Sequence, residues 1–157
     1  MARILIDTRL WALSLKVPFL AEHDPVLEQA VKARNFVSSV LENDDLLFSS
    51  QLVAEIYHVL TQAGNEIPDD QARRLIGDLL ERRGTIYRPI SEAVLNQCMD
   101  LSARSGIHLT DYLVVYPFED VIDRIYTMDP HFQHASLMSV ALIENPLGIW
   151  RTEDQEL

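Results

Sequence analysis

The stretch ARILIDTRLW, residues 2–11, joins a short aliphatic run to an aspartate, Asp7. The run RILI is typical of a buried strand of a parallel sheet. A second stretch, RIYTMDPHF at residues 124–132, repeats the arrangement and carries Asp129 just past a strand-like run. Because parallel strands end at the same edge of a sheet, both carboxylates are expected at that edge, where the functional crevice of such folds lies.

The rest of the chain alternates strand-like and helix-like segments. Expected strands lie at 3–6, 45–49, 85–90 and 124–127, with a last edge strand within 135–143. Expected helices lie at 24–44, 50–64, 68–84, 91–106 and 110–116, several opened by Ser or Pro and closed by Gly. This alternation predicts an α/β protein, a three-layer α/β/α sandwich with a mostly parallel central sheet.

Length and composition limit the classes of protein. With 157 residues and one cysteine, Cys98, the chain is expected to form one domain over 1–150, with a polar tail at 151–157, in a reducing cytoplasmic compartment. No targeting segment and no membrane span of ~20 apolar residues is expected. The formal charge of −11 argues against broad grip on a nucleic-acid backbone, but not against an enzyme that binds a phosphodiester through metal ions.

Two more acids are expected at the same edge of the sheet. Glu55 lies early in the helix after DLLFS, and Asp111 begins the helix after GIHLT. Each acid alone has a structural explanation, as a turn residue or as an acid favoured by a helix dipole. Four carboxylates in one cleft would repel, so either some are protonated or a cation neutralises them. Oxygen ligands favour Mg²⁺ or Mn²⁺, which activate water for attack on phosphorus.

Four stretches, in order, resemble the motifs of the PIN-domain ribonucleases, and among these the VapC-like toxins of toxin–antitoxin pairs. ILIDTRLWAL is similar to the first motif and FSSQLVAEIYHVLT to the second. GIHLTDYLVV resembles the third, and IYTMDPHF the fourth. The resemblance covers residues 3–132 and rests most on the second and fourth stretches. It implies a PIN-like fold that cleaves single-stranded RNA with Mg²⁺ or Mn²⁺.

The resemblance also implies roles for individual residues and partners. Asp7 and Asp111 would be the principal metal ligands, and Glu55 and Asp129 would complete the acidic pocket, directly or through water. Thr127 would orient the pocket by hydrogen bonding, or serve only as a strand-end threonine. The implied partners are the RNA substrate, a small antitoxin protein that covers the cleft, and a second copy of the chain as a homodimer. No membrane partner is implied.

Some residues depart from the family pattern. Arg9 stands where a small polar residue is usual, and it either pairs with the carboxylates in place of a metal, contacts the substrate phosphate, or points away. The helix after Asp111 is unusually bulky, so the pocket floor is expected to differ. The alternative is therefore a catalytically weakened PIN-like binding or assembly module. Four histidines near the acids are read as surface or capping residues: His58, His108, His131 and His134. Alternatively, His58, His108 or His131 would donate a proton or bind phosphate, and His131 and His134 would be metal ligands on one face.

Overall fold

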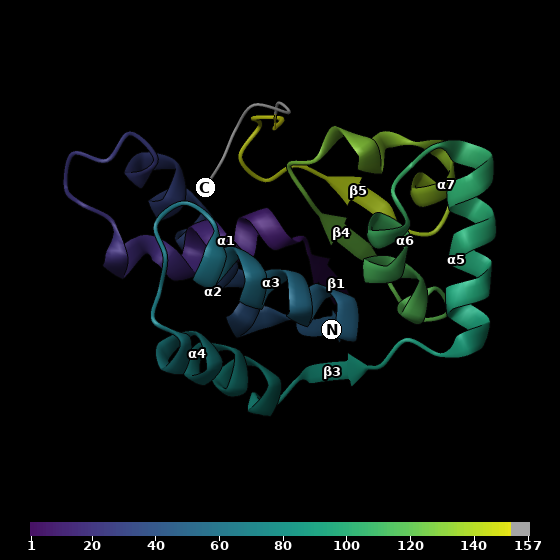
Figure 1. Ribbon diagram of the computed structural model, residues 1–157, viewed down its shortest axis with the longest axis horizontal. Coiled ribbons are helices and arrows are strands. Elements are labelled where there is room, and N and C mark those ends of the chain that lie inside the picture. The colour runs from purple at the N-terminus through teal and green to yellow at the C-terminus, as the bar shows by residue number, and fades with distance from the viewer. Residues whose placement is uncertain (152–157) are drawn as a thin grey trace.

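The computed structural model describes residues 1–151, and five strands form one sheet. Every neighbouring pair of strands is parallel, in the order β3-β2-β1-β4-β5 (Figure 1), so the predicted α/β fold is confirmed. The strands are β1 (Arg3–Ile6), β2 (Asp45–Ser49), β3 (Thr85–Arg88), β4 (Arg124–Tyr126) and β5 (Leu142–Glu144).

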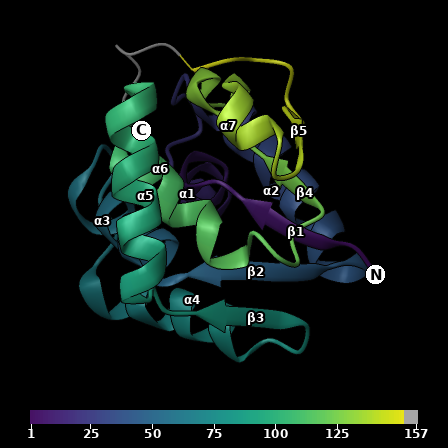
Figure 2. The ribbon, with the colours of Figure 1, turned by 90° about the vertical axis from the view of Figure 1, so that its right-hand side faces the viewer.

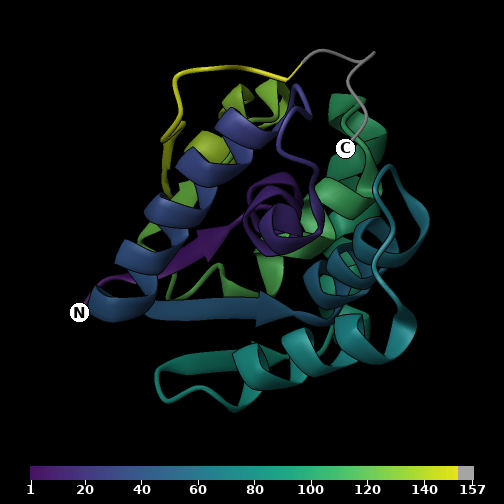
Figure 3. The same cartoon turned by 90° about the vertical axis from the view of Figure 1, so that its left-hand side faces the viewer.

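Helices cover both faces of the sheet. From β1 the chain moves one way along the sheet to β3 and then returns past β1 to β4 and β5, so right-handed crossovers put the two sets of helices on opposite faces. Helices α1–α4 lie on one face (Figure 3) and α5–α7 on the other (Figure 2). The helices are α1 (Thr8–Lys16), α2 (Leu27–Asn43), α3 (Ser50–Gln62), α4 (Asp69–Glu81), α5 (Glu92–Ser105), α6 (Leu109–Val115) and α7 (Ala135–Met138); three 3₁₀ turns are η1 (Val17–Phe19), η2 (Tyr116–Phe118) and η3 (Pro130–Gln133).

The direction of the chain reverses around β1, the central strand. A crevice opens at such a switch point beyond the carboxyl ends of the strands, here between β1 and β4. The three apolar residues of β1 are at most 1% exposed. Next to this strand, Trp11 of α1 packs on Phe48 of β2, with ring centroids 5.2 Å apart. The crevice therefore stands on a well-packed core.

Two helix starts follow the predicted capping. The Ser49 hydroxyl accepts a hydrogen bond from the Leu52 N–H at 3.2 Å, and Ser91 does the same for Val94. The predicted helix at 24–44 starts later, at Leu27, because the Asp24 carboxylate accepts from Val26 N–H within a preceding turn.

Two parts of the sequence interpretation were wrong. Residues 8–16 had been assigned no element, yet they form α1, in which the polar residues Arg9, Ser14 and Lys16 are buried together with the apolar ones. The edge strand expected within 135–143 is confined to 142–144, because His134 caps a short helix, α7, over the first part.

Pro117 limits the length of α6, which stops at Val115 and continues as the η2 turn. Within residues 1–151, no helix is both long and apolar enough to cross a membrane. The expected polar tail at 151–157 lies outside the described residues except for Arg151.

Candidate active site

All four acids singled out from the sequence line one cavity of about 620 Å³ at the carboxyl end of the sheet. Asp7 follows β1 directly, and Asp129 follows β4 and begins η3. Glu55 projects from the second turn of α3, and Asp111 from the first turn of α6. The parallel topology thus brings together acids that lie more than a hundred residues apart in the sequence.

Thr127 holds two of these acids in place. Its side chain is fully buried, and its hydroxyl donates to Asp7 Oδ2 at 2.9 Å. The Thr127 hydroxyl oxygen also accepts a hydrogen bond from the backbone N–H of Asp129 at 3.0 Å. One hydroxyl therefore connects the ends of β1 and β4.

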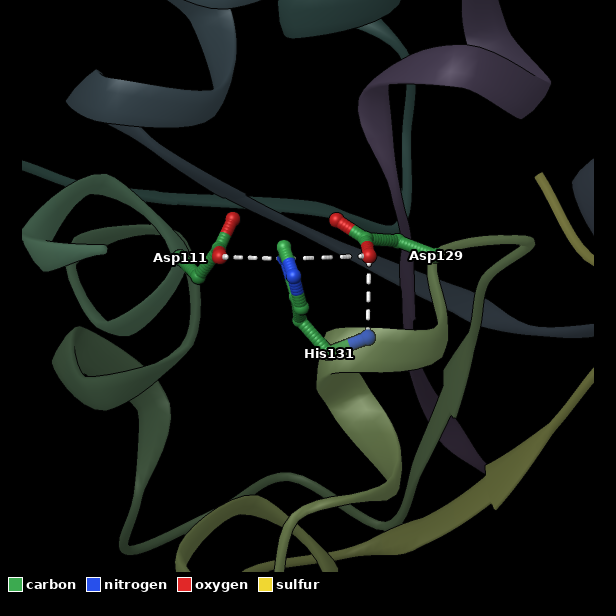
Figure 4. A group of neighbouring side chains, drawn as sticks. All are labelled: Asp111, Asp129 and His131. Carbon is green, nitrogen blue, oxygen red and sulfur yellow. Dashed lines mark hydrogen bonds and ion pairs between the residues drawn. The ribbon is translucent and has the colours of Figure 1, made fainter. Parts of the chain in front are cut away.

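Asp111, Asp129 and His131 form the tightest part of the cluster (Figure 4). One ligand atom from each residue lies within 4.8 Å of the others. The imidazole of His131 lies between the two carboxylates, with Nδ1 3.4 Å from Asp129 Oδ1 and 3.8 Å from Asp111 Oδ2. Asp7 and Glu55 line the same cavity outside this group.

Burial makes the acids of the cavity reluctant to ionise. It raises the pKa of Asp7 to about 7, and the charges of Asp129 and Asp111 add to the effect. It raises the pKa of Glu55 to about 8, with Asp7 and Asp111 adding to it. The pKa of Asp111 rises to about 6, again mainly through burial and then through Asp129, while His131 opposes the rise.

Two arginines also line the cavity. Arg9 is only 7% exposed, its Nε has no hydrogen-bond partner among the described residues, and it forms no ion pair with a carboxylate there. Burial, and then the charge of Arg151, lowers the pKa of the Arg9 guanidinium. Arg9 therefore does not replace a metal by pairing with the acids.

Arg151 was not found from the sequence. Its backbone N–H donates to the carbonyl of Met128 at 2.7 Å, which fixes the chain beside Asp129. The sequence around Arg151 does not predict this contact, because a segment without helical or strand periodicity carries no signal for its position.

The bulky residues after Asp111 and the histidines near the acids leave the cavity open. The bulky residues after Asp111, from Tyr112 to Val115, are buried in the core and do not line the cavity. His58 lines the cavity wall and His108 lies beside His131, with ring centroids 6.0 Å apart. His134 serves as the cap of α7, its Nδ1 accepting from Ser136 N–H at 3.1 Å.

The donor set fits a divalent cation. Glu55 Oε2 is buried without a hydrogen-bond partner among the described residues, which is costly for an acceptor unless a cation or proton satisfies it. Four carboxylates supply oxygen ligands, and His131 adds one nitrogen close to two of them. The residues present can therefore hold the ion that the resemblance implies.

Comparison with known proteins gives structural neighbours only. No family model matches the chain, and no curated protein matches its sequence. A chain in the structure of VapBC2 from Rickettsia felis, bound to a DNA fragment from their promoter, is 13% identical with a TM-score of 0.60, and the match covers 91% of this chain and 98% of that chain. Mycobacterium tuberculosis VapC20, a sarcin–ricin loop cleaving toxin, is 13% identical with a TM-score of 0.62, and the match covers 83% and 92%.

The two neighbours agree with the fold class inferred from the four sequence motifs. At this level of identity the likeness concerns the fold, in which a five-stranded parallel sheet carries helices on both faces. The chain has the PIN-domain fold of the VapC toxins.

Proposed function

We propose that this protein is a metal-dependent endoribonuclease that cleaves single-stranded RNA, and that it is the toxin of a toxin–antitoxin pair. The observation that carries the proposal is the convergence of Asp7, Glu55, Asp111 and Asp129 on one cavity at the switch point of the sheet. The two VapC neighbours support it, since one of them is a toxin that cleaves the sarcin–ricin loop.

The four acids would hold a divalent cation, Mg²⁺ or Mn²⁺, with Asp7 and Asp111 as principal ligands. Such an ion lowers the pKa of a bound water and stabilises charge on a phosphodiester. Glu55 and Asp129 would position the attacking water or a second ion. Thr127 keeps the Asp7 carboxylate turned towards the cavity through its hydrogen bond.

Arg9 would bind the substrate phosphate. Its guanidinium is buried at the cavity wall with a free Nε, and a phosphate oxygen is the acceptor that this group lacks. Arg151 brings a second positive charge to the same cavity. The alternative of a weakened binding or assembly module is not favoured, because Arg9 forms no ion pair with the four cavity acids within residues 1–151.

The proposed partners are single-stranded RNA, a small antitoxin that covers the cavity, and a second copy of the chain. The Rickettsia felis neighbour was solved as VapBC2, which supports looking for such a partner. We place the protein in the cytoplasm, where RNA is the available substrate.

The test joins metal binding to RNA cleavage. Mn²⁺ at ten times its dissociation constant is expected to raise the unfolding free energy of the wild type by about 1.4 kcal/mol, and to leave an Asp7→Asn, Asp111→Asn double variant unchanged. Asp111→Asn alone is expected to fold normally and to lose cleavage of a mixed-sequence RNA pool by about 100-fold or more. Undiminished cleavage by Asp111→Asn would remove the assignment.

A further inference from the structure

His131 lies where a metal ligand would lie. Within residues 1–151, Asp111, Asp129 and His131 are the one group of three potential ligands with atoms mutually within 4.8 Å. The side chains come from two elements that meet at the cavity, α6 and η3 (Figure 4). Two carboxylate oxygens and one imidazole nitrogen therefore face a common point.

The spacing suits one shared ion. Neighbouring ligands of an octahedral ion with bonds of about 2.1 Å lie about 3 Å apart. Nδ1 of His131 lies 3.4 Å from Asp129 Oδ1 and 3.8 Å from Asp111 Oδ2, so each gap exceeds that spacing by less than one ångström. The His131 side chain is 46% exposed and has room to make this adjustment.

The backbone prepares the nitrogen for this position. The Asp129 carboxylate accepts the His131 N–H at 2.9 Å, which closes the start of η3 and brings the imidazole over the same carboxylate. Asp129 is held from the other side by Thr127. His131 is thus placed by the turn that places Asp129, and substitution of its side chain leaves the backbone bond in place.

We propose that Nδ1 of His131 is a direct ligand of the ion, together with Asp111 and Asp129, and that this nitrogen makes the site selective for Mn²⁺ over Mg²⁺. Mg²⁺ binds oxygen ligands almost exclusively, whereas first-row transition ions also accept imidazole. Asp129, assigned above to the water or a second ion, thus becomes a direct ligand, while Asp7 remains a ligand at the same cavity and Glu55 positions the water or a second ion. The inference rests on the metal-dependent function proposed above and narrows its choice of ion.

The decisive measurement is pulsed electron paramagnetic resonance on the full chain, stripped of metal and loaded with Mn²⁺ alone. A directly bound imidazole gives the Mn²⁺ signal a nitrogen hyperfine coupling. We expect this coupling in the wild type, its loss in His131→Gln, and its retention in His108→Gln. His108 is the matched control, because its ring lies beside His131 but outside the group of three ligands.

Calorimetric titration gives a second readout that does not depend on catalysis. His131→Gln is expected to weaken Mn²⁺ binding by about tenfold or more and Mg²⁺ binding by much less, so that the preference for Mn²⁺ shrinks. Circular dichroism confirms that the variant folds, as expected for a half-exposed side chain.

The outcomes separate this inference from the proposed function. Mn²⁺ that binds without nitrogen coupling would overturn the role of His131, which would then be an ion-pair partner of the aspartates, while metal-dependent cleavage would stand. An unchanged Mn²⁺ to Mg²⁺ preference in His131→Gln would also overturn it. A chain that binds neither ion would overturn both proposals together.

Discussion

Helix α1 buries a cation near each of its ends, and the two are satisfied differently. Lys16 is 2% exposed, and its Nζ donates to the carbonyl of Ala63, just past the end of α3. Arg9 is 7% exposed, but its Nε has no partner within residues 1–151. An unsatisfied buried donor costs stability. Lys16 and Arg9 are therefore both buried, but they are expected to have different roles. Lys16 joins two helices, and Arg9 faces the cavity with a donor to spare.

The acids repeat this contrast. On the surface, Asp120 pairs with Arg88 at 2.7 Å and Asp100 with Arg104. Exposed pairs of this kind add little stability, but each of these two acids has an arginine as its partner. In the cavity, by comparison, no lysine or arginine of the described residues forms an ion pair with the acids, and only the imidazole of His131 lies within ion-pair distance. Four acids that are at least partly buried, and that lack a lysine or arginine partner among residues 1–151, thus lie together at one end of the sheet.

The largest expected effect is on stability as a function of pH. The folded pKa values of about 7 for Asp7 and about 8 for Glu55 lie above the ordinary values of 3.8 and 4.5. The folded state therefore binds more protons at these two acids, and the stability that they contribute is greatest below about pH 4 and falls as pH rises towards 8. Without metal, this loss is expected to be on the order of a few kcal/mol.

Chemical denaturation at pH 5 and pH 8 measures this loss, with an Asp7→Asn, Glu55→Gln variant as the reference. The wild type should lose more stability between the two pH values than the variant does, and added Mn²⁺ should offset most of the difference at pH 8. Equal losses in both proteins would mean that burial does not raise the pKa values of Asp7 and Glu55, and the cavity acids would then not differ from the surface acids.

The next effect concerns Arg9. Arg9→Met removes a charge-assisted contact to phosphate worth about 1.5–3 kcal/mol, so RNA cleavage should fall about 10- to 100-fold. The slope of the logarithm of RNA affinity against the logarithm of salt concentration should fall by the contribution of about one phosphate contact. The unfolding free energy should stay the same or rise, because a poorly satisfied buried charge is lost. Wild-type cleavage in this variant would show that Arg9 does not touch the substrate.

The smallest effect concerns Lys16, the matched control for Arg9. Lys16→Met removes the hydrogen bond to the Ala63 carbonyl and should lower the unfolding free energy by about 1 kcal/mol. Metal binding and RNA cleavage per folded molecule should be unchanged, because Lys16 does not line the cavity. A variant with normal stability and poor cleavage would reverse the roles assigned to the two cations.

The sequence predicted the sheet and the meeting of the four acids, because both follow from local patterns and from parallel topology. Aliphatic runs mark the strands, and residues after parallel strands share one edge. Their catalytic roles stay a prediction.

Other features depend on tertiary contacts that leave no periodic signal. Helix α1 buries Arg9, Ser14 and Lys16 together with its apolar residues, so the polarity of its residues does not mark a side that faces solvent. The unpaired state of Arg9, the nearness of His131 to two aspartates and the approach of Arg151 are set by packing between distant segments. Sequence reasoning offered three alternatives for Arg9 and could not choose, because side-chain direction was the deciding fact.

The central position of β1 also governs when the cavity can exist during synthesis. The hydrogen bond from Thr127 to Asp7 spans 120 residues, and β1 is the first of the five strands of the sheet to be synthesised. One side of β1 can pair with β2 early, but its other side waits for β4, near the end of the described chain. Such long-range pairing forms late. A nascent chain that stops before Asp111 carries two of the four acids and no complete cavity, so the activity proposed above would have to wait until β4 and Asp129 have been made.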